Sequence, residues 1–315
     1  MDRLAELELL VKVADCGSLT QAAEALGLSK PAASRHLAAL EERLNTRLVE
    51  RNTRRLFLTE EGLVYLERAR HILGELREAD AVISSKTINP TGVLRVSASL
   101  SFAMQQIAPR LARFRERYPQ LRVHVEVSNR YLDMIDNDID VAIRTREFEP
   151  DSSITIRRLA ATRRVLCASP AYVSRKGTPR TPADLDQHDF LLYVLANRSN
   201  ELRLSRGGEM ERVQVQGVLT SNDGQVLRAA ALKGMGILVQ PSYIVYDDIV
   251  SGRLIPILNE WDLPRLQINI AYQSRRYPSA KVRAFVDFLA TEFAAGDFER
   301  RWTGYMGLQS ADRPG

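Results

Sequence analysis

Residues 18–35 of this 315-residue chain read SLTQAAEALGLSKPAASR. Gly27 divides two stretches of helix-forming residues, because glycine commonly ends a helix. Ser18 caps the first stretch, since Gln21 then occupies the third helical position of a capping box. Ser29 caps the second stretch, whose first turn holds a proline. Two short helices joined by a glycine-containing turn predict a helix-turn-helix.

The second helix of this pair carries side chains that suit DNA. Small residues at its start, Ala32, Ala33 and Ser34, let a helix come close to base edges in the major groove. Lys30 and Arg35 can then reach phosphates or the acceptor atoms of guanine. The alternative is a small helical bundle whose cations face solvent and bind no DNA.

A basic segment at residues 47–59 is expected to form two short strands around a turn. Its Arg51, Arg54 and Arg55 would lie along a phosphate backbone or enter the minor groove, as the wing of a winged helix does. The wing strengthens the expectation that double-stranded DNA is a partner.

Five segments follow one another near the N-terminus: VADCGSLT (13–20), AAEAL (22–26), LSKPAASR (28–35), LVER (48–51) and LTEEG (58–62). Together they resemble the N-terminal signature of the LysR-type transcriptional regulators. The resemblance implies a winged helix-turn-helix DNA-binding domain over residues 1–59, with the motif itself near residues 19–38.

The resemblance implies DNA contacts around the starts of the two helices and along the wing. The side chains concerned are Thr20, Gln21, Ser29, Lys30, Pro31, Ser34, Arg35, Arg51, Arg54 and Arg55. Lys30 departs from the family, which often has glutamine there. Glutamine suits adenine whereas lysine suits guanine, so the base preference stays open. Asn45 stands where the family often has glycine, and asparagine tolerates a left-handed helix end.

Residues 60–88 are predicted to form one long helix that connects the DNA-binding region to the rest of the chain. Its apolar residues repeat at three- and four-residue spacing: Leu63, Leu66, Ala69, Leu73, Leu76, Ala79 and Ile83. This stripe is too long for one small domain to cover, which favours a coiled coil with a second copy of the chain. The resemblance also implies a dimer, with a tetramer as the next assembly. The alternative is an amphipathic helix that lies on its own core.

From residue 89 onward, strands alternate with helices, which predicts an α/β domain with a parallel, helix-covered sheet. The expected strands are 93–97, 121–127, 139–144, 164–168, 213–219, 236–239 and 266–273, and the expected helices are 102–118, 225–233 and 279–293. The resemblance implies a two-lobed effector domain over residues 89–300, like the periplasmic binding proteins, followed by a tail at 301–315.

Mostly polar residues follow the strand ends of this domain, where open α/β sheets bind ligands. They are Ser99, Leu100, Ser101, Ser128, Asn129, Arg144, Thr145, Ser221, Asn222 and Asp223. Hydroxyl and amide groups beside an arginine suit a small carboxylate effector held between two lobes. The alternative is that Ser99, Ser221 and Asn222 are ordinary helix caps.

Composition and motifs exclude several other classes of protein. The chain lacks the run of about 18 apolar residues that a membrane span needs, and its start is no secretory signal, so we expect a cytoplasmic protein. A net charge of +5 permits a polyanionic partner. The two cysteines and four histidines show no metal-ligand spacing, so no metal, cofactor or catalytic residue is expected.

Two further motifs are expected to be structural. Gly234 and Gly236 follow a helix and precede a strand, which is typical of a helix-ending turn and not of a dinucleotide site. The segment CASPAY (167–172), with Pro182, Leu185 and His188, is expected to shape a turn and a helix.

The sequence therefore predicts a regulator that binds promoters sequence-specifically, at an interrupted palindrome, and responds to a small-molecule effector; RNA polymerase is a further candidate partner. The alternative is a small-molecule-binding or enzymatic α/β module whose N-terminal region serves dimerisation and non-specific DNA binding. The two hypotheses differ in how salt and competing DNA affect binding.

Overall fold

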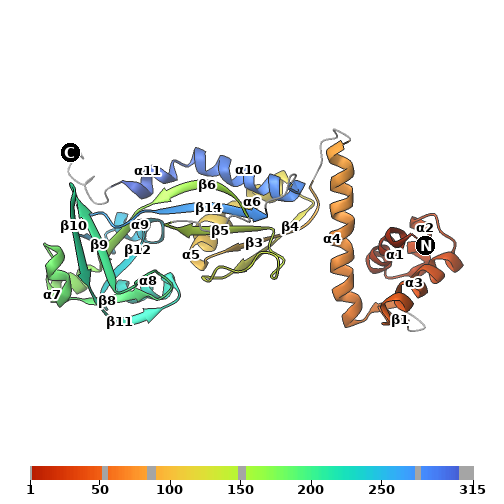
Figure 1. Cartoon of the computed structure of the whole chain (residues 1–315), viewed down its shortest axis with the longest axis horizontal. Coiled ribbons are helices and arrows are strands. Elements are labelled where there is room, and N and C mark those ends of the chain that lie inside the picture. The colour runs from red at the N-terminus through yellow and green to blue at the C-terminus, as the bar shows by residue number, and fades with distance from the viewer. Residues whose placement is uncertain (1, 52–55, 84–89, 148–153, 274–277, 305–315) are drawn as a thin grey trace. The chain divides into compact units, whose positions relative to one another are not determined.

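The computed structural model describes residues 2–51, 56–83, 90–147, 154–273 and 278–304. The chain divides into two compact units, residues 1–92 and 93–315 (Figure 1). Each unit has its own hydrophobic core.

The first unit is a winged helix-turn-helix followed by a long helix. Its elements are α1 (Arg3–Cys16), α2 (Leu19–Ala25), α3 (Lys30–Leu44), β1 (Val49–Arg51), β2 (Leu56–Leu58) and α4 (Glu60–Ile83). The predicted caps are confirmed, because the Ser18 hydroxyl accepts from the Gln21 amide and the Ser29 hydroxyl from the Ala32 amide. The β1 and β2 strands pair antiparallel, as expected for a wing.

The apolar stripe of α4 is divided between two environments. Leu66, Ala69 and Leu73 are buried, and the last two pack with Leu7 of α1. This part of the stripe therefore lies on its own core, as the alternative interpretation held. Leu63 and Leu76 of the stripe are exposed, and so is Ile72, which lies beside the stripe. The side chains of Ala79 and Ile83, and residues 84–88 of the connecting segment, lie outside the described part of the chain.

The second unit has two lobes, each built on a five-stranded sheet. The sheet of lobe 1 has the order β4-β3-β5-β14-β6, from β3 (Gly92–Ala98), β4 (Leu121–Val127), β5 (Val141–Arg146), β6 (Ile154–Thr162) and β14 (Leu266–Gln273). Strands β3 and β5 are parallel, but β14 runs antiparallel to both β5 and β6. The expectation of a purely parallel sheet is therefore wrong, because β14 returns from lobe 2 in the opposite direction.

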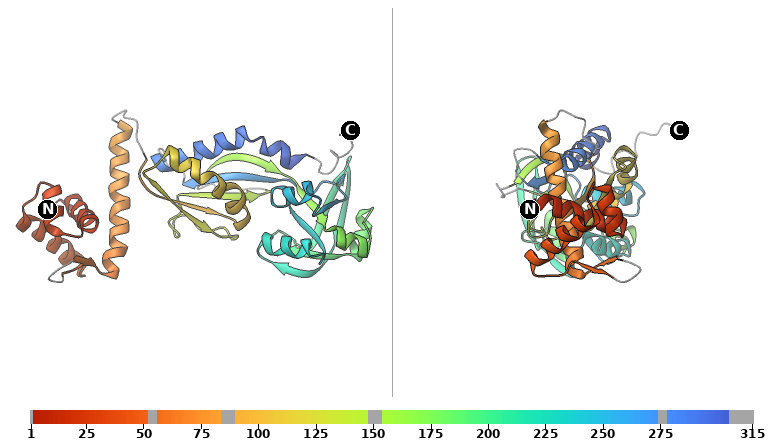
Figure 2. Two further views of the ribbon diagram at one scale, coloured as in Figure 1. Left: turned by 180° about the vertical axis from the view of Figure 1, so that it is seen from behind. Right: turned by 90° about the vertical axis from the view of Figure 1, so that its right-hand side faces the viewer.

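Helices cover the lobe-1 sheet. They are α5 (Leu100–Phe102), the π-helix η1 (Ala103–Ile107), the 3-10 helix η2 (Ala108–Arg110), α6 (Leu111–Arg117), α10 (Ala280–Ala295) and α11 (Phe298–Thr303). Figure 2 shows α10 running along this sheet. The single helix expected at 102–118 is interrupted at η1 and η2, where Pro109 removes one backbone donor.

The sheet of lobe 2 has the order β11-β8-β12-β7-β13. Its strands are β7 (Arg164–Ala168), β8 (Asp189–Tyr193), β11 (Gln216–Ser221), β12 (Ile237–Pro241) and β13 (Ile255–Ile257). The helices that pack around this sheet are α7 (Pro170–Lys176), η3 (Pro182–Gln187), α8 (Gly224–Leu232) and α9 (Ser242–Val250). A separate hairpin contains β9 (Glu201–Arg206) and β10 (Glu209–Gln214). The strand expected at 213–219 is therefore two strands, and the buried Val215 lies between them.

The chain crosses between the lobes at Arg163, a residue that is only 1% exposed. Its guanidinium donates to the Asp262 carboxylate at 2.9 Å and to the Asn259 carbonyl at 3.0 Å. The Arg163 amide also donates to the carbonyl of Trp302, which is buried in α11. Packed structure thus extends past residue 300, where the tail was expected to begin, because Trp302 belongs to the core.

Candidate functional site

The start of α3 presents most of the predicted DNA-contacting side chains to solvent. Ala33 and Leu37 are buried and fix the opposite face of α3 in the core. The predicted residues Thr20, Gln21, Ser29, Lys30, Pro31 and Arg35 are exposed, and Ser34 is half-buried. One polar and cationic surface therefore forms around the starts of α2 and α3.

The wing is tied to the C-terminal half of α3 by a side chain that sequence reasoning missed. One carboxylate oxygen of Glu41 accepts from the backbone amides of Leu48 and Val49, at 2.8 and 3.0 Å. Nothing in the sequence distinguishes Glu41 from an ordinary solvent-facing helix carboxylate. Of the predicted wing residues, Arg54 and Arg55 lie outside the described residues, as does the side chain of Arg51.

At the base of the wing, Thr59 joins β2 to the start of α4. Its hydroxyl donates to the Arg47 carbonyl and accepts from the Gly62 amide, and its own amide donates to the Leu48 carbonyl. The wing and the first turn of α4 therefore form one hydrogen-bonded joint.

Most of the predicted effector residues lie where α5 of lobe 1 faces α8 of lobe 2. Ser99 caps α5, since its hydroxyl accepts from the Phe102 amide. Asp223 caps α8, and the Ser221 hydroxyl in turn accepts from the Asp223 amide. The capping interpretation therefore holds for Ser99, whereas the cap of α8 is Asp223 and neither Ser221 nor Asn222.

Hydrogen bonds connect these segments across the two lobes. The Gln225 side chain donates to the Ser101 hydroxyl at 2.9 Å, and the Asn129 amide group donates to the Asp223 carboxylate at 2.7 Å. The Leu100 backbone amide donates to the Asn129 side chain. We call this set, completed by Ser99, Thr145, Ser221 and Tyr243, the lobe junction.

Tyrosines form a second part of the lobe junction that sequence reasoning missed. Burial raises the pKa of Tyr243 to about 12, although hydrogen bonds with Ser99 and Thr145 act in the opposite direction. Burial also raises the pKa of Tyr193 to about 12. The hydroxyl of Tyr131 donates to the Thr145 carbonyl at 2.8 Å. The phenols of Tyr193 and Tyr243 therefore stay neutral near pH 7 and can donate hydrogen bonds there.

Two arginines stand beside Tyr131. The guanidinium carbon of Arg146 lies 3.6 Å from the centre of the Tyr131 ring, and that of the buried Arg144 lies 5.8 Å from it. The predicted Arg144 is thus close to the lobe junction. Ser128, in contrast, donates to the nearby Arg130 carbonyl, and Asn222 is exposed.

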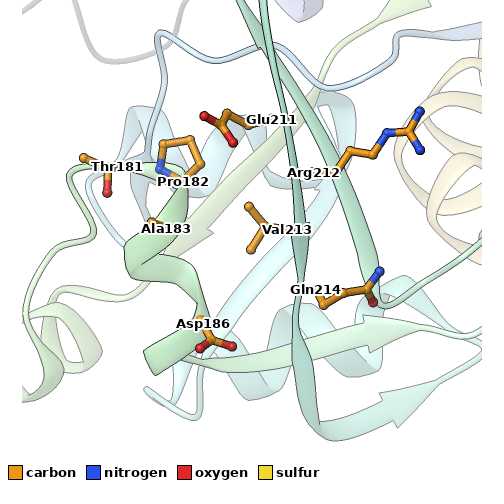
Figure 3. A pocket seen from close by; sticks show the side chains of 8 residues that line it. All are labelled: Thr181, Pro182, Ala183, Asp186, Glu211, Arg212, Val213 and Gln214. Atoms are coloured by element: carbon orange, nitrogen blue, oxygen red, sulfur yellow. The ribbon is translucent and has the colours of Figure 1, made fainter.

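Two cavities lie apart from the predicted effector residues. One has a volume of about 340 Å³ and lies between η3 and β10, lined by Thr181, Pro182, Ala183, Asp186, Glu211, Arg212, Val213 and Gln214. Figure 3 shows Val213 directed toward η3 and Arg212 directed away from it. The other, of about 550 Å³, lies between α7 and α8.

In the described ranges, no group of three or more histidine, cysteine, aspartate or glutamate side chains could hold a metal ion. No helix within the same ranges is long and apolar enough to cross a bilayer.

Comparison with known families identifies both parts of the chain. Residues 4–63 match the model of the bacterial regulatory helix-turn-helix proteins of the lysR family, and residues 88–294 match the LysR substrate binding domain. The chain is a LysR-type transcriptional regulator. Its first unit is the helix-turn-helix domain of that family, and its second unit is the effector-binding domain.

Relatives and solved structures match this regulator over most of its length. The transcriptional regulator CrgA of Neisseria meningitidis is 34% identical over 91% of this chain and 96% of its own. The transcriptional activator TtdR of Escherichia coli is 33% identical over 90% of this chain and 92% of its own. The CrgA structure has a TM-score of 0.61 and covers 93% of this chain and 99% of its own, at 33% identity.

Proposed function

We propose that the surface around the starts of α2 and α3 binds promoter DNA. The observation that carries this proposal is the exposure of Lys30 and Arg35 on a helix whose opposite face, at Ala33 and Leu37, is buried. A helix held in this way can enter a major groove while its cations reach phosphates and guanine acceptors. The wing arginines would add phosphate or minor-groove contacts.

We further propose that α4 pairs two copies of the regulator. Ile72 and Leu76 are exposed and lie four residues apart, on one face of this helix, and apolar side chains of that size favour burial against a partner. Two copies would present two α3 helices to the half-sites of an interrupted palindrome. A tetramer would be a pair of such dimers.

The lobe junction is the proposed effector site, and its ligand a small carboxylate. Support comes from the convergence of hydroxyls from Ser99, Ser101 and Thr145 with the cation of Arg144 nearby. A ligand can change the regulator only if it binds one arrangement of the lobes better than another. The proposed signal is therefore a change in lobe closure that alters the spacing of the two DNA-binding domains.

The role in transcription requires access to promoter DNA, and hence to the cytoplasm, where RNA polymerase would be a further partner. The proposal assigns no catalytic step to the chain. The competing function, an effector-binding or enzymatic module with accessory DNA affinity, predicts binding that is indifferent to sequence and lost at moderate salt.

The test is a titration of the DNA upstream of the regulator's own gene, read by fluorescence anisotropy at two salt concentrations. Arg35→Ala and Arg51→Ala should each weaken binding by roughly tenfold, whereas Arg283→Ala, an exposed substitution on α10, should not. Unchanged affinity of both variants for this DNA would refute the proposed interface. Equal binding of a shuffled sequence would favour the competing function.

A further inference from the structure

The cavity between α7 and α8 in lobe 2 is lined by apolar and cationic side chains, as many ligand sites are, and its lining includes no residue of the lobe junction. Its volume of about 550 Å³ falls within the range of small-molecule sites, about 300–1,000 Å³. The lining residues are Ser169, Pro170, Ala171, Ala229, Leu232, Lys233 and Arg253. Most of these are small or apolar, two are cations, and none is a carboxylate.

The charges next to the cavity favour an anion. Arg253 pairs with the fully buried Asp248, with 2.6 Å between their nitrogen and oxygen atoms. The same carboxylate also accepts from Arg228 of α8, at 2.8 Å. Lys233 is exposed at the end of α8. Because two arginines share the single carboxylate of Asp248 and Lys233 adds a third cation, positive charge remains at the cavity.

A chain of polar contacts leads from this cavity to the lobe junction. Arg253 contacts Asp248, which binds Arg228, and Arg228 donates in turn to the Gln225 side chain at 3.4 Å. Gln225 donates to the Ser101 hydroxyl in lobe 1, at 2.9 Å. Helix α8 therefore carries both a contact to the other lobe and the link to the cavity.

We infer that this cavity is a second ligand site, for an anion with an aliphatic body, and that its occupant is coupled to the lobe junction. The anionic group would bind Lys233 and Arg253, and the aliphatic body would cover Pro170, Ala171 and Leu232. The ligand competes with Asp248 for Arg253. Once Arg253 turns to the ligand, Asp248 is held by Arg228 alone, and the contact of Arg228 with Gln225 changes.

The first experiment measures binding without DNA, so that it does not depend on the proposed promoter function. Octanoate is titrated into the full chain by calorimetry, with inorganic phosphate and octan-1-ol as comparison ligands. We expect octanoate to bind, and each comparison ligand, which lacks either the aliphatic body or the charge, to bind at least about tenfold more weakly.

Substitutions in the same experiment locate the site. Lys233→Gln and Arg253→Gln should each weaken octanoate binding by about tenfold, and Arg283→Gln on α10 serves as the matched control. Lys233 is exposed, so its replacement keeps the assignment testable if Arg253→Gln destabilises the fold through Asp248. Absence of octanoate binding, unchanged binding in both cavity variants, or equal binding of phosphate would overturn the site.

The second experiment tests the coupling by hydrogen exchange. Octanoate should alter amide exchange in residues 99–107 of the wild-type chain. The Gln225→Met variant should still bind octanoate but show no such change, because its side chain cannot connect Arg228 to Ser101. A change of equal size in both proteins, or in neither, would refute the coupling.

Discussion

Gly62, in the first turn of α4, lies against the backbone of the wing. A methyl group on its Cα would overlap the Leu48 carbonyl oxygen and lie 2.9 Å from the carbonyl carbon. That oxygen accepts the hydrogen bond from the Thr59 amide, at 3.0 Å. The atoms that would clash with this methyl group belong to the backbone of Leu48, so no flexible side chain can move aside to make room. Gly62→Ala should therefore separate the wing from α4.

The expected loss of stability follows from three contributions. Overpacking of this kind costs about 1–3 kcal/mol, and loss of the Thr59 hydrogen bond costs about 1 kcal/mol. Alanine is better than glycine in a helix by up to about 1 kcal/mol, and by less in a first turn. We expect Gly62→Ala to destabilise the first unit by about 1–4 kcal/mol and to weaken promoter binding, because the wing moves away from α3.

Gly74 provides a control on the same helix. No atom lies within 4 Å of a methyl group added there, so Gly74→Ala should stabilise α4 by about 0.5–1 kcal/mol. Native-state hydrogen exchange of the α1 core amides measures both effects within the first unit. A gain in stability from Gly62→Ala, or a loss of similar size from both substitutions, would refute the steric reasoning.

Three further perturbations have distinct expected outcomes. Lys30→Gln should shift base preference at one operator position from guanine toward adenine, by about 1–3 kcal/mol, measured by anisotropy with paired oligonucleotides; an unchanged preference would mean that Lys30 reads no base. Glu41→Ala should destabilise the first unit by about 2 kcal/mol, because two wing amides lose their acceptor, and urea denaturation would detect it. Burial lowers the pKa of His188, so the folded state favours the neutral ring. The unfolded chain then binds more protons as the pH falls below about 6.5, and stability should decrease there. Denaturation of His188→Asn at the same pH values should show a flatter dependence, and an equal slope in both proteins would exclude His188 as the cause.

The sequence predicts the first unit well because its signals are local. Ser18 and Ser29 cap their helices with their own hydroxyls, and Gly17 takes the left-handed conformation that ends α1. Such signals act within four residues and do not depend on the rest of the fold.

In the second unit, the motif at Tyr172 and His188 is structural, as the sequence predicts. The Tyr172 hydroxyl contacts the His188 ring and accepts from the Asp189 amide.

The sequence predicts the second unit less well where distant segments decide the structure. Residues 213–219 look like one strand, yet β10 pairs only with β9, whereas β11 joins the main sheet beside β8. Pairing partners are set by packing across the lobe and leave no periodic trace in a single strand. The direction of β14 is hidden for the same reason, because it depends on the path of the chain between the lobes.

The candidate effector site shows the same limit in more detail. The strand-end rule selects Ser101 and Asn129, but it cannot predict that Gln225 and Asp223 of the other lobe bind them. These polar groups already satisfy one another, so an effector that binds at this proposed site must replace their hydrogen bonds and gains only the difference in free energy. A neutral ligand that offers equivalent hydrogen bonds would gain little at the junction. A carboxylate gains more, because hydrogen bonds to an ionised group are stronger and Arg144 stands close by. The charge of the ligand, more than its shape, should therefore determine which effectors can open the contacts between the lobes.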